Sequence, residues 1–367
     1  MSNKKIFSSH KLGDTALANR IVMAPMTRSR AIDNLPNELM ATYYSQRATA
    51  GVNITEGVSP SPNGLGYARI PGIFSKEQTQ AWKKVTAAVH AKDGKIIIQL
   101  MHTGRIGHTL NLPEGARLVA PSAVVAPGQM WTDKEGMKDH PAPEVLTADE
   151  LQATKQEYIQ AARNAIEAGF DGIELHGANG YLLEQFLSPH SNVRTDAYGG
   201  TIENRSRFVL EVAKEVSQEI GKEKVGIRLS PYGVFNDMPH YPEIDATYAY
   251  LADELNKIGV AHVHLVDHSG GGAPEVPIKI KKEIRERFKN TLILSGGYNL
   301  NRAEEDLSSQ LGDLVAFGRP FISNPDLVNR LINQYPLNLL PDAATFYTPG
   351  EKGYIDYPVY DNETITA

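Results

Sequence analysis

The chain has 367 residues, 41% of them hydrophobic, a formal net charge of −6 and no cysteine. This composition is typical of a globular protein with a sizeable core, and the interspersed charges exclude the cationic face that binds nucleic acid or an anionic membrane. Without cysteine there can be no disulfide, thiolate nucleophile or cysteine metal site, so any redox chemistry requires a bound cofactor.

The sequence also predicts a location. No apolar run reaches the roughly 18–20 residues that a membrane span requires, and the first ten residues are too polar for the core of a signal peptide. We therefore expect a cytoplasmic protein, either a monomer or a small homo-oligomer.

The first predicted elements are a hairpin and a strand. Residues 6–24 contain a turn at Leu12, Gly13 and Asp14, followed by the apolar strand 21–23, which stops before Pro25. We expect the hairpin to act as a lid and the strand to be the first of the core.

Seven further apolar runs follow at long intervals, which makes eight predicted strands. Amphipathic stretches lie between them, and two of these begin with capping signals, at Ser75 and Thr147. Alternating strands and helices predict a parallel sheet, and eight units favour a closed (β/α)8 barrel. The alternative, a Rossmann sheet, requires a G-x-G-x-x-G motif that is absent. The seven runs are 52–54, 96–100, 172–175, 225–229, 263–266, 292–294 and 314–317, and the helical stretches are 76–92, 147–168, 202–220 and 246–258.

The segment 103–146 is rich in proline and glycine and has weak periodicity. It is predicted to be a long loop after the third strand, and loops at that end of a barrel lie over the active site. Residues 1–367 are expected to form a single domain.

Glycines follow the seventh and eighth predicted strands. Gly296, Gly297 and Gly318 would let backbone N–H groups approach a phosphate, and Arg319 would add a charged, bidentate donor. Tight turns alone would also explain the glycines at either strand end. The two ends together indicate a ligand that carries a phosphate.

Six segments of the chain resemble the Old Yellow Enzyme family of ene-reductases. They occur in order between about Asn19 and Tyr360 and so cover nearly the whole chain. They are 23–28 (MAPMTR), 99–105 (QLMHTGR), 176–181 (HGANGY), 188–208, 317–322 (FGRPFI) and 353–358 (GYIDYP). The resemblance implies non-covalent FMN in a (β/α)8 barrel that takes hydride from NADPH or NADH. It also implies substrates with an activated C=C bond, such as α,β-unsaturated carbonyls and maleimides, with nitro-compounds as further candidates.

The resemblance also implies which residues hold FMN. Thr27 would bond the isoalloxazine O4, Gln99 the pyrimidine edge, and Arg228 would lie near N1 and O2, where negative charge collects on reduction. The full implied set is Pro25, Thr27, Gly57, Gln99, Arg228 and, around the phosphate, Gly296, Gly297, Gly318 and Arg319.

Three residues after the fourth strand carry the implied chemistry. His176 and Asn179 would both donate to the oxygen of an enone, and Tyr181 would protonate the α-carbon. A lone histidine at a strand end is more often structural, but the whole His-x-x-Asn-x-Tyr set beside a flavin favours catalysis. The implied walls of the substrate pocket are Tyr67, Met101 and Tyr354, and Met101 stands where family members often carry tryptophan.

Other polar residues are expected to have structural roles. His102 and Arg105 are interpreted as scaffold for the long loop. The alternating His262, His264 and His268 around the sixth strand are explained by the strand's pleat, and no metal is expected.

Two other functions remain open. A phosphate-binding aldolase or isomerase would require a lysine or a carboxylate at a strand end. No lysine follows any predicted strand, although Glu56 and Asp267 keep the carboxylate version possible. A flavin protein without turnover would be expected to lack the proton donor, whereas Tyr181 is present.

Overall fold

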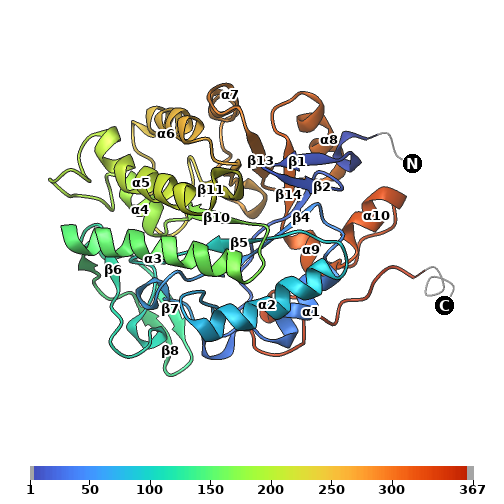
Figure 1. Cartoon of the computed structure of the whole chain (residues 1–367), viewed down its shortest axis with the longest axis horizontal. Helices are drawn as coiled ribbons and strands as arrows, with labels where there is room; N and C mark the ends of the chain where they lie inside the picture. The colour runs from blue at the N-terminus through green and yellow to red at the C-terminus, as the bar shows by residue number, and fades with distance from the viewer. Residues whose placement is uncertain (1–3, 362–367) are drawn as a thin grey trace.

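The computed structural model describes residues 4–361. Its centre is a closed barrel of eight parallel strands, surrounded by helices (Figure 1). The strands are β3 (Ile21–Met23), β4 (Val52–Val58), β5 (Ile96–Leu100), β10 (Gly172–Gly177), β11 (Val225–Leu229), β12 (His262–Leu265), β13 (Thr291–Ser295) and β14 (Leu314–Phe317). β14 pairs with β3 and closes the barrel. The prediction of eight parallel strands in a (β/α)8 barrel is confirmed.

The strands are apolar throughout because both of their faces are buried. Side chains such as Val22, Ile54 and Ile293 fill the barrel interior. Their neighbours along the same strands, such as Ile21 and Leu292, pack between the barrel and the helices. The two clusters account for the continuous apolar runs in the sequence.

The four predicted helical stretches are all helices. They are α2 (Lys76–His90), α3 (Ala148–Glu167), α5 (Ile202–Ile220) and α6 (Ile244–Ile258). Ser75 and Thr147 both form capping boxes, with Gln78 and Glu150 respectively. The shorter helices were not predicted: α1 (Glu38–Gln46), α4 (Leu182–Leu187), α7 (Ile278–Arg287), α8 (Leu300–Ser308), α9 (Arg319–Ser323) and α10 (Leu327–Asn333). No helix within residues 4–361 is long and apolar enough to cross a membrane.

The N-terminal hairpin closes the end of the barrel that lies opposite the predicted site. Its strands are β1 (His10–Leu12) and β2 (Thr15–Leu17). Leu12 and Leu17 pack into the barrel interior, and Gly13 lies against the carbonyl of Glu223, just before β11. Gly13 has φ +55°, and a side chain there would collide with that carbonyl. The lid therefore covers the amino ends of the strands.

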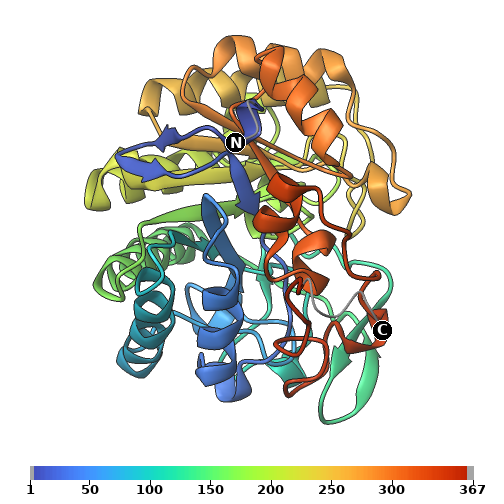
Figure 2. The same cartoon turned by 90° about the vertical axis from the view of Figure 1, so that its right-hand side faces the viewer.

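The long segment after β5 covers the opposite end. It carries two small sheets, β6 (Val119–Ala120) with β9 (Glu144–Val145) and β7 (Gln129–Thr132) with β8 (Gly136–Asp139). Figure 2 shows the β7–β8 hairpin beside the C-terminal segment. Arg69 links them, because it pairs with Asp133 next to β7 and donates to the carbonyl of Tyr347 at 2.7 Å. The long loop was predicted, but its strands were not.

Candidate active site

Two adjoining cavities open at the carboxyl ends of the barrel strands. One has a volume of about 540 Å³ and the other about 850 Å³, both within the range of small-molecule sites. Six residues line both cavities, so a ligand can extend from one into the other. The shared residues are Pro25, Thr27, Arg228, Phe235, His268 and Tyr347.

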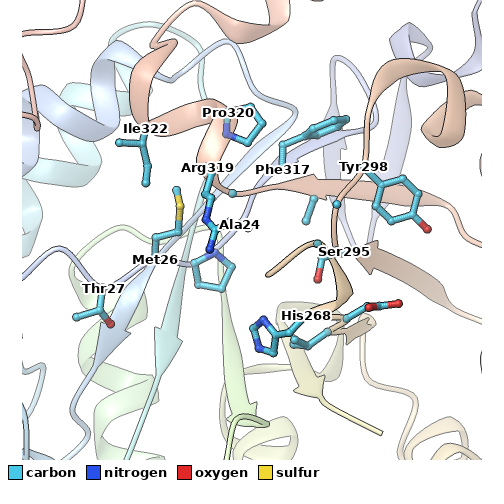
Figure 3. A pocket seen from close by; sticks show the side chains of 18 of the residues that line it. Ala24, Met26, Thr27, His268, Ser295, Tyr298, Phe317, Arg319, Pro320 and Ile322 are labelled. Carbon is cyan, nitrogen blue, oxygen red and sulfur yellow. The ribbon is translucent and has the colours of Figure 1, made fainter. Parts of the chain in front are cut away.

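The smaller cavity contains the predicted phosphate site. Gly296, Gly297, Gly318 and Arg319 all line it. Gly296 has φ +119°, and a Cβ there would collide with the carbonyl of Asp267, so the turn after β13 requires glycine. The guanidinium of Arg319 is exposed in the cavity and has no hydrogen-bonding or ion-pair partner within residues 4–361. In Figure 3 its side chain reaches into the cavity from the side opposite His268. An unpaired guanidinium beside glycine turns suits a phosphate.

Arg228 is the other cation of the two cavities that has no hydrogen-bonding or ion-pair partner among residues 4–361. It is buried at the carboxyl end of β11, its Nε has no partner, and burial lowers its pKa to about 10. A buried cation without a hydrogen-bonding partner is costly. Because Arg228 faces both cavities, an electron-rich edge of a bound ring, such as the pyrimidine side of FMN, would satisfy it.

Gln99 lies on β5, separated from the strand of Arg228 by β10 alone, and a carboxylate on β10 orients its side chain. Its Nε2 donates to Glu174 Oε1 at 2.8 Å, which leaves its Oε1 free to accept from a ligand. The other oxygen of Glu174 is bonded by His264 at 2.9 Å and His262 at 3.1 Å. Burial alone would raise the pKa of Glu174, but the two histidines hold it well below the usual value. The structure thus gives His262 and His264 a carboxylate partner, which the sequence did not suggest.

The remaining predicted cofactor residues also line the cavities. Thr27 and Pro25 face both of them, and Gly57 faces the larger. Gly57 lies within β4, which continues through a register shift to Val58, rather than after the strand as predicted. A side chain at Gly57 would collide with Met101. The predicted cofactor residues therefore form one continuous lining of the two cavities.

His176, Asn179 and Tyr181 converge on the larger cavity from the end of β10. Burial, together with Arg228, holds the pKa of His176 well below its usual value, so the imidazole is neutral. The Tyr181 ring lies 5.0 Å from it between centroids. Burial raises the pKa of Tyr181, and its hydroxyl hydrogen-bonds that of Tyr67 at 3.0 Å. The protonated phenol of Tyr181 therefore lies in the same cavity as the side chains of His176 and Asn179, which can both donate a hydrogen bond to a ligand.

One predicted wall of the pocket is wrong. Tyr67 and Met101 line the larger cavity, but Tyr354 lines neither. It is wholly buried and stacks on Tyr43 with centroids 4.1 Å apart. Tyr347, seven residues earlier, lines the cavities instead.

Several lining residues were not predicted, and they lie on irregular segments. Phe235 and Asn236 belong to the loop after β11, and Tyr347 to the C-terminal segment. Neither segment shows the periodicity that would have indicated which side chains face inward. His102 and Arg105 do not line the cavities. Arg105 forms a salt bridge of 3.1 Å with Asp237 and so links the long segment after β5 to the loop after β11.

The two competing carboxylates are poorly placed for catalysis. Glu56 is buried among Tyr44 and Arg28 and lines neither cavity. Asp267 lines the smaller cavity but is paired with Lys281 at 2.8 Å. No group of three His, Cys, Asp or Glu side chains within residues 4–361 could hold a metal ion.

Fold and site together define a (β/α)8 barrel oxidoreductase with an FMN site at the carboxyl ends of its strands. The family model of the NADH:flavin oxidoreductase / NADH oxidase family matches residues 5–338. The chain belongs to this family, that of the Old Yellow Enzymes.

Individual relatives are similar over nearly their whole length. A probable flavin mononucleotide-dependent alkene reductase of Leishmania infantum is 42% identical, with 95% of each chain covered. A chanoclavine-I aldehyde reductase of Penicillium roqueforti is also 42% identical, with 96% of each covered. Among solved structures, morphinone reductase is 43% identical with a TM-score of 0.94, covering 99% of this chain and 98% of that one.

Proposed function

We propose that this protein reduces the activated C=C bond of α,β-unsaturated carbonyl compounds, with His176 and Asn179 binding the carbonyl oxygen and Tyr181 delivering the proton. Maleimides belong to the same substrate class, and nitro-compounds share the polarised oxygen. The chain is an FMN-dependent NAD(P)H oxidoreductase of the ene-reductase kind. The observation that carries the assignment of residues is the convergence of these three side chains on the cavity that Arg228 also faces.

FMN supplies the redox chemistry, because when bound it accepts hydride from the nicotinamide and passes it to the β-carbon. The chain's own residues would hold it: Arg319 and the glycines at the phosphate, and Thr27, Gln99 and Arg228 at the ring. A fixed cation at Arg228 favours negative charge at the neighbouring ring edge.

His176 and Asn179 would polarise the carbonyl group of the substrate. As hydride reaches the β-carbon, negative charge develops on the carbonyl oxygen, and two donors aimed at that oxygen stabilise it more than they stabilise the ground state. A neutral imidazole suits this role, because it donates without giving up its proton.

Tyr181 would then protonate the α-carbon. Its raised pKa keeps the phenol protonated at neutral pH, and the hydrogen bond between the hydroxyls of Tyr181 and Tyr67 offers a route for replacing the proton. Tyr67 is thus proposed to pass a proton to Tyr181 through its hydroxyl, in addition to lining the substrate pocket.

The remaining assignments are proposals of the same kind. We propose that residues 1–367 act as one FMN-binding domain, that the enzyme is a cytoplasmic monomer or small homo-oligomer, and that an activated alkene and NADPH or NADH are its small-molecule partners. Morphinone reductase, one of the solved relatives, is described in complex with tetrahydroNAD.

The test is anaerobic stopped-flow spectroscopy of the two half-reactions. NADPH or NADH should bleach the yellow protein, and 2-cyclohexenone should restore the colour at a rate that depends on its concentration. A protein that is bleached but not reoxidised by enones, maleimides or nitro-compounds would contradict the proposal.

A further inference from the structure

The backbone of Asn179 is held from several directions. Its N–H donates to Ser230 Oγ at 2.9 Å, and its carbonyl accepts from Asn236 Nδ2 at 2.8 Å. The next N–H, that of Gly180, donates to Glu184 at 2.6 Å. Asn179 has φ +60°, a conformation that asparagine tolerates better than most residues. Only the side chain of Asn179 therefore remains to be oriented.

The orientation of that side chain decides what it can do. A carboxamide has an acceptor oxygen on one side and a donor NH2 on the other. With Nδ2 toward the cavity, Asn179 stabilises a substrate oxygen; with Oδ1 there, it repels one. Backbone constraints do not distinguish the two, because they differ by a rotation about the last side-chain bond.

His268 distinguishes them. Its Nε2 lies 2.8 Å from Asn179 Oδ1. Since Oδ1 can only accept, this contact requires the tautomer of His268 with a proton on Nε2. Nδ2 of Asn179 makes no hydrogen bond to any residue between 4 and 361 and is left for the cavity that Asn179 lines.

His268 is itself well anchored just beyond β12. The carboxylate of Asp267 accepts from the N–H of Ser269 at 2.9 Å and from Lys281 at 2.8 Å, which fixes the turn. The ring of Phe235 lies 5.9 Å from the imidazole. Figure 3 shows the His268 side chain directed into the smaller cavity from this turn. The turn that carries His268 is therefore anchored by its neighbours, and the imidazole itself contacts Asn179 and the ring of Phe235.

We propose that His268 is a positioning residue, whose Nε2–H fixes the carboxamide of Asn179 with its NH2 group toward the substrate oxygen. The inference rests on the proposed function, in which Asn179 binds that oxygen. It assigns a role to a histidine that the sequence pattern left as a strand-end residue.

The experiment is a double-mutant cycle on the FMN-loaded protein, with phenol and 2-cyclohexenone as probes. The variants are Asn179→Ala, His268→Leu, the double variant and His268→Gln, whose side-chain NH2 can replace the donor. Phenol binding is measured from the change in FMN absorption, and KM and kcat are measured for the enone. His240→Leu is the control, because His240 is exposed on the loop after β11 and bonds only the carbonyl of Tyr232, at 3.0 Å, within residues 4–361.

We expect His268→Leu to raise the Kd for phenol about 3- to 10-fold, in line with the loss of one oriented hydrogen bond. His268→Gln should recover most of the affinity, and His240→Leu should match the parent. In the Asn179→Ala background, His268→Leu should change the Kd less than about 2-fold, because its effect passes through Asn179.

Three results separate the possible failures. An equal loss from His268→Leu in both backgrounds would show that His268 acts independently and overturn the inference. A His268→Gln variant as weak as His268→Leu would also overturn it, because donation would not be the cause. An Asn179→Ala variant that binds phenol and reduces enone like the parent would instead overturn the assignment of Asn179 in the proposed function, and the inference with it.

Discussion

At the scale of single residues, the site is built from groups that the fold leaves unsatisfied. Within residues 4–361, Nε of the buried Arg228 has no hydrogen-bonding partner, and neither has the buried Nδ1 of His176. Such groups are expensive in a stable core. Both residues line the larger cavity, where a polar ligand could satisfy them.

Tyr181→Phe should separate the two half-reactions. The ring packing survives and only the hydroxyl is lost, so reduction by NADPH should stay nearly constant. Reoxidation by 2-cyclohexenone should slow by about 10²- to 10⁴-fold, the usual value of a general acid. Anaerobic stopped-flow measures both rates, after the FMN content has been matched. An equal loss in both half-reactions would make Tyr181 structural, and no loss in either would make another group the donor.

Met101→Trp should narrow the substrate range. Met101 is buried at the wall of the larger cavity, with its thioether against Gly57 and close to Tyr181. A rigid bicyclic ring in its place would fill part of that cavity next to the proposed FMN site. We expect reoxidation by carvone to fall about 10-fold or more relative to 2-cyclohexenone, since shape differences in a pocket are worth roughly 1–3 kcal/mol. Equal effects on the two substrates would place Met101 outside the pocket.

At the scale of elements, the C-terminal segment shows how distant parts of the chain complete the site. Arg28 and Arg30 follow β3, and both donate to the carbonyl of Phe346; Arg28 also donates to that of Gly353 at 2.6 Å. The Arg30 guanidinium lies 4.7 Å from the Tyr354 ring centroid. These contacts bury Tyr354 and leave Tyr347 facing the cavities.

The helices, by contrast, are specified locally. Thr147→Ala should lower the free energy of unfolding by about 1 kcal/mol, because it removes the side chain that caps α3 through the N–H of Glu150. Urea unfolding followed by circular dichroism measures the change. Thr42→Ala on the exposed face of α1 is the control and should stay within about 0.5 kcal/mol of the parent. A Thr147→Ala variant as stable as Thr42→Ala would contradict the capping role.

At the scale of the whole molecule, folding and cofactor binding are linked through the carboxyl end of the barrel. The core clusters pack the barrel strands against one another and against the helices, whereas the guanidinium of Arg319 has no hydrogen-bonding or ion-pair partner in the part of the chain that the structure describes. A cofactor that binds only the folded barrel must raise its stability. The apo and FMN-loaded forms should therefore respond differently to a change in the phosphate site.

Arg319→Ala tests this linkage. The apo variant should unfold like the apo parent, because the exposed guanidinium has no hydrogen bond or ion pair within residues 4–361 that could be lost. The Kd for FMN should rise about 10- to 150-fold, the equivalent of about 1.5–3 kcal/mol for hydrogen bonds to a charged group. At FMN equal to 100 times the parental Kd, stabilisation should fall from about 2.7 to about 1.4 kcal/mol or less.

Thermal unfolding with and without FMN, together with a fluorescence titration, gives these numbers. Arg207→Ala, on the exposed face of α5, is the matched control and should bind FMN like the parent. If Arg319→Ala binds FMN as tightly as Arg207→Ala, the phosphate lies elsewhere.

The sequence by itself determined the eight strands, the four long helices and the polar residues at the strand ends. A strand buried on both faces is a continuous apolar run whatever its neighbours are, and a residue that ends such a run must lie at the carboxyl edge of the barrel. Both are local properties, so they can be read from the order of residues alone.

Only the tertiary structure decided which end of the barrel the hairpin closes, which tyrosine of the C-terminal segment faces the cavities, and what His262, His264 and His268 bind. Each depends on contacts between residues far apart in the chain, such as Gly13 with Glu223, Arg30 with Tyr354, and His264 with Glu174. In irregular segments no periodicity fixes the direction of a side chain, so its direction follows from packing and charge pairing across the whole barrel.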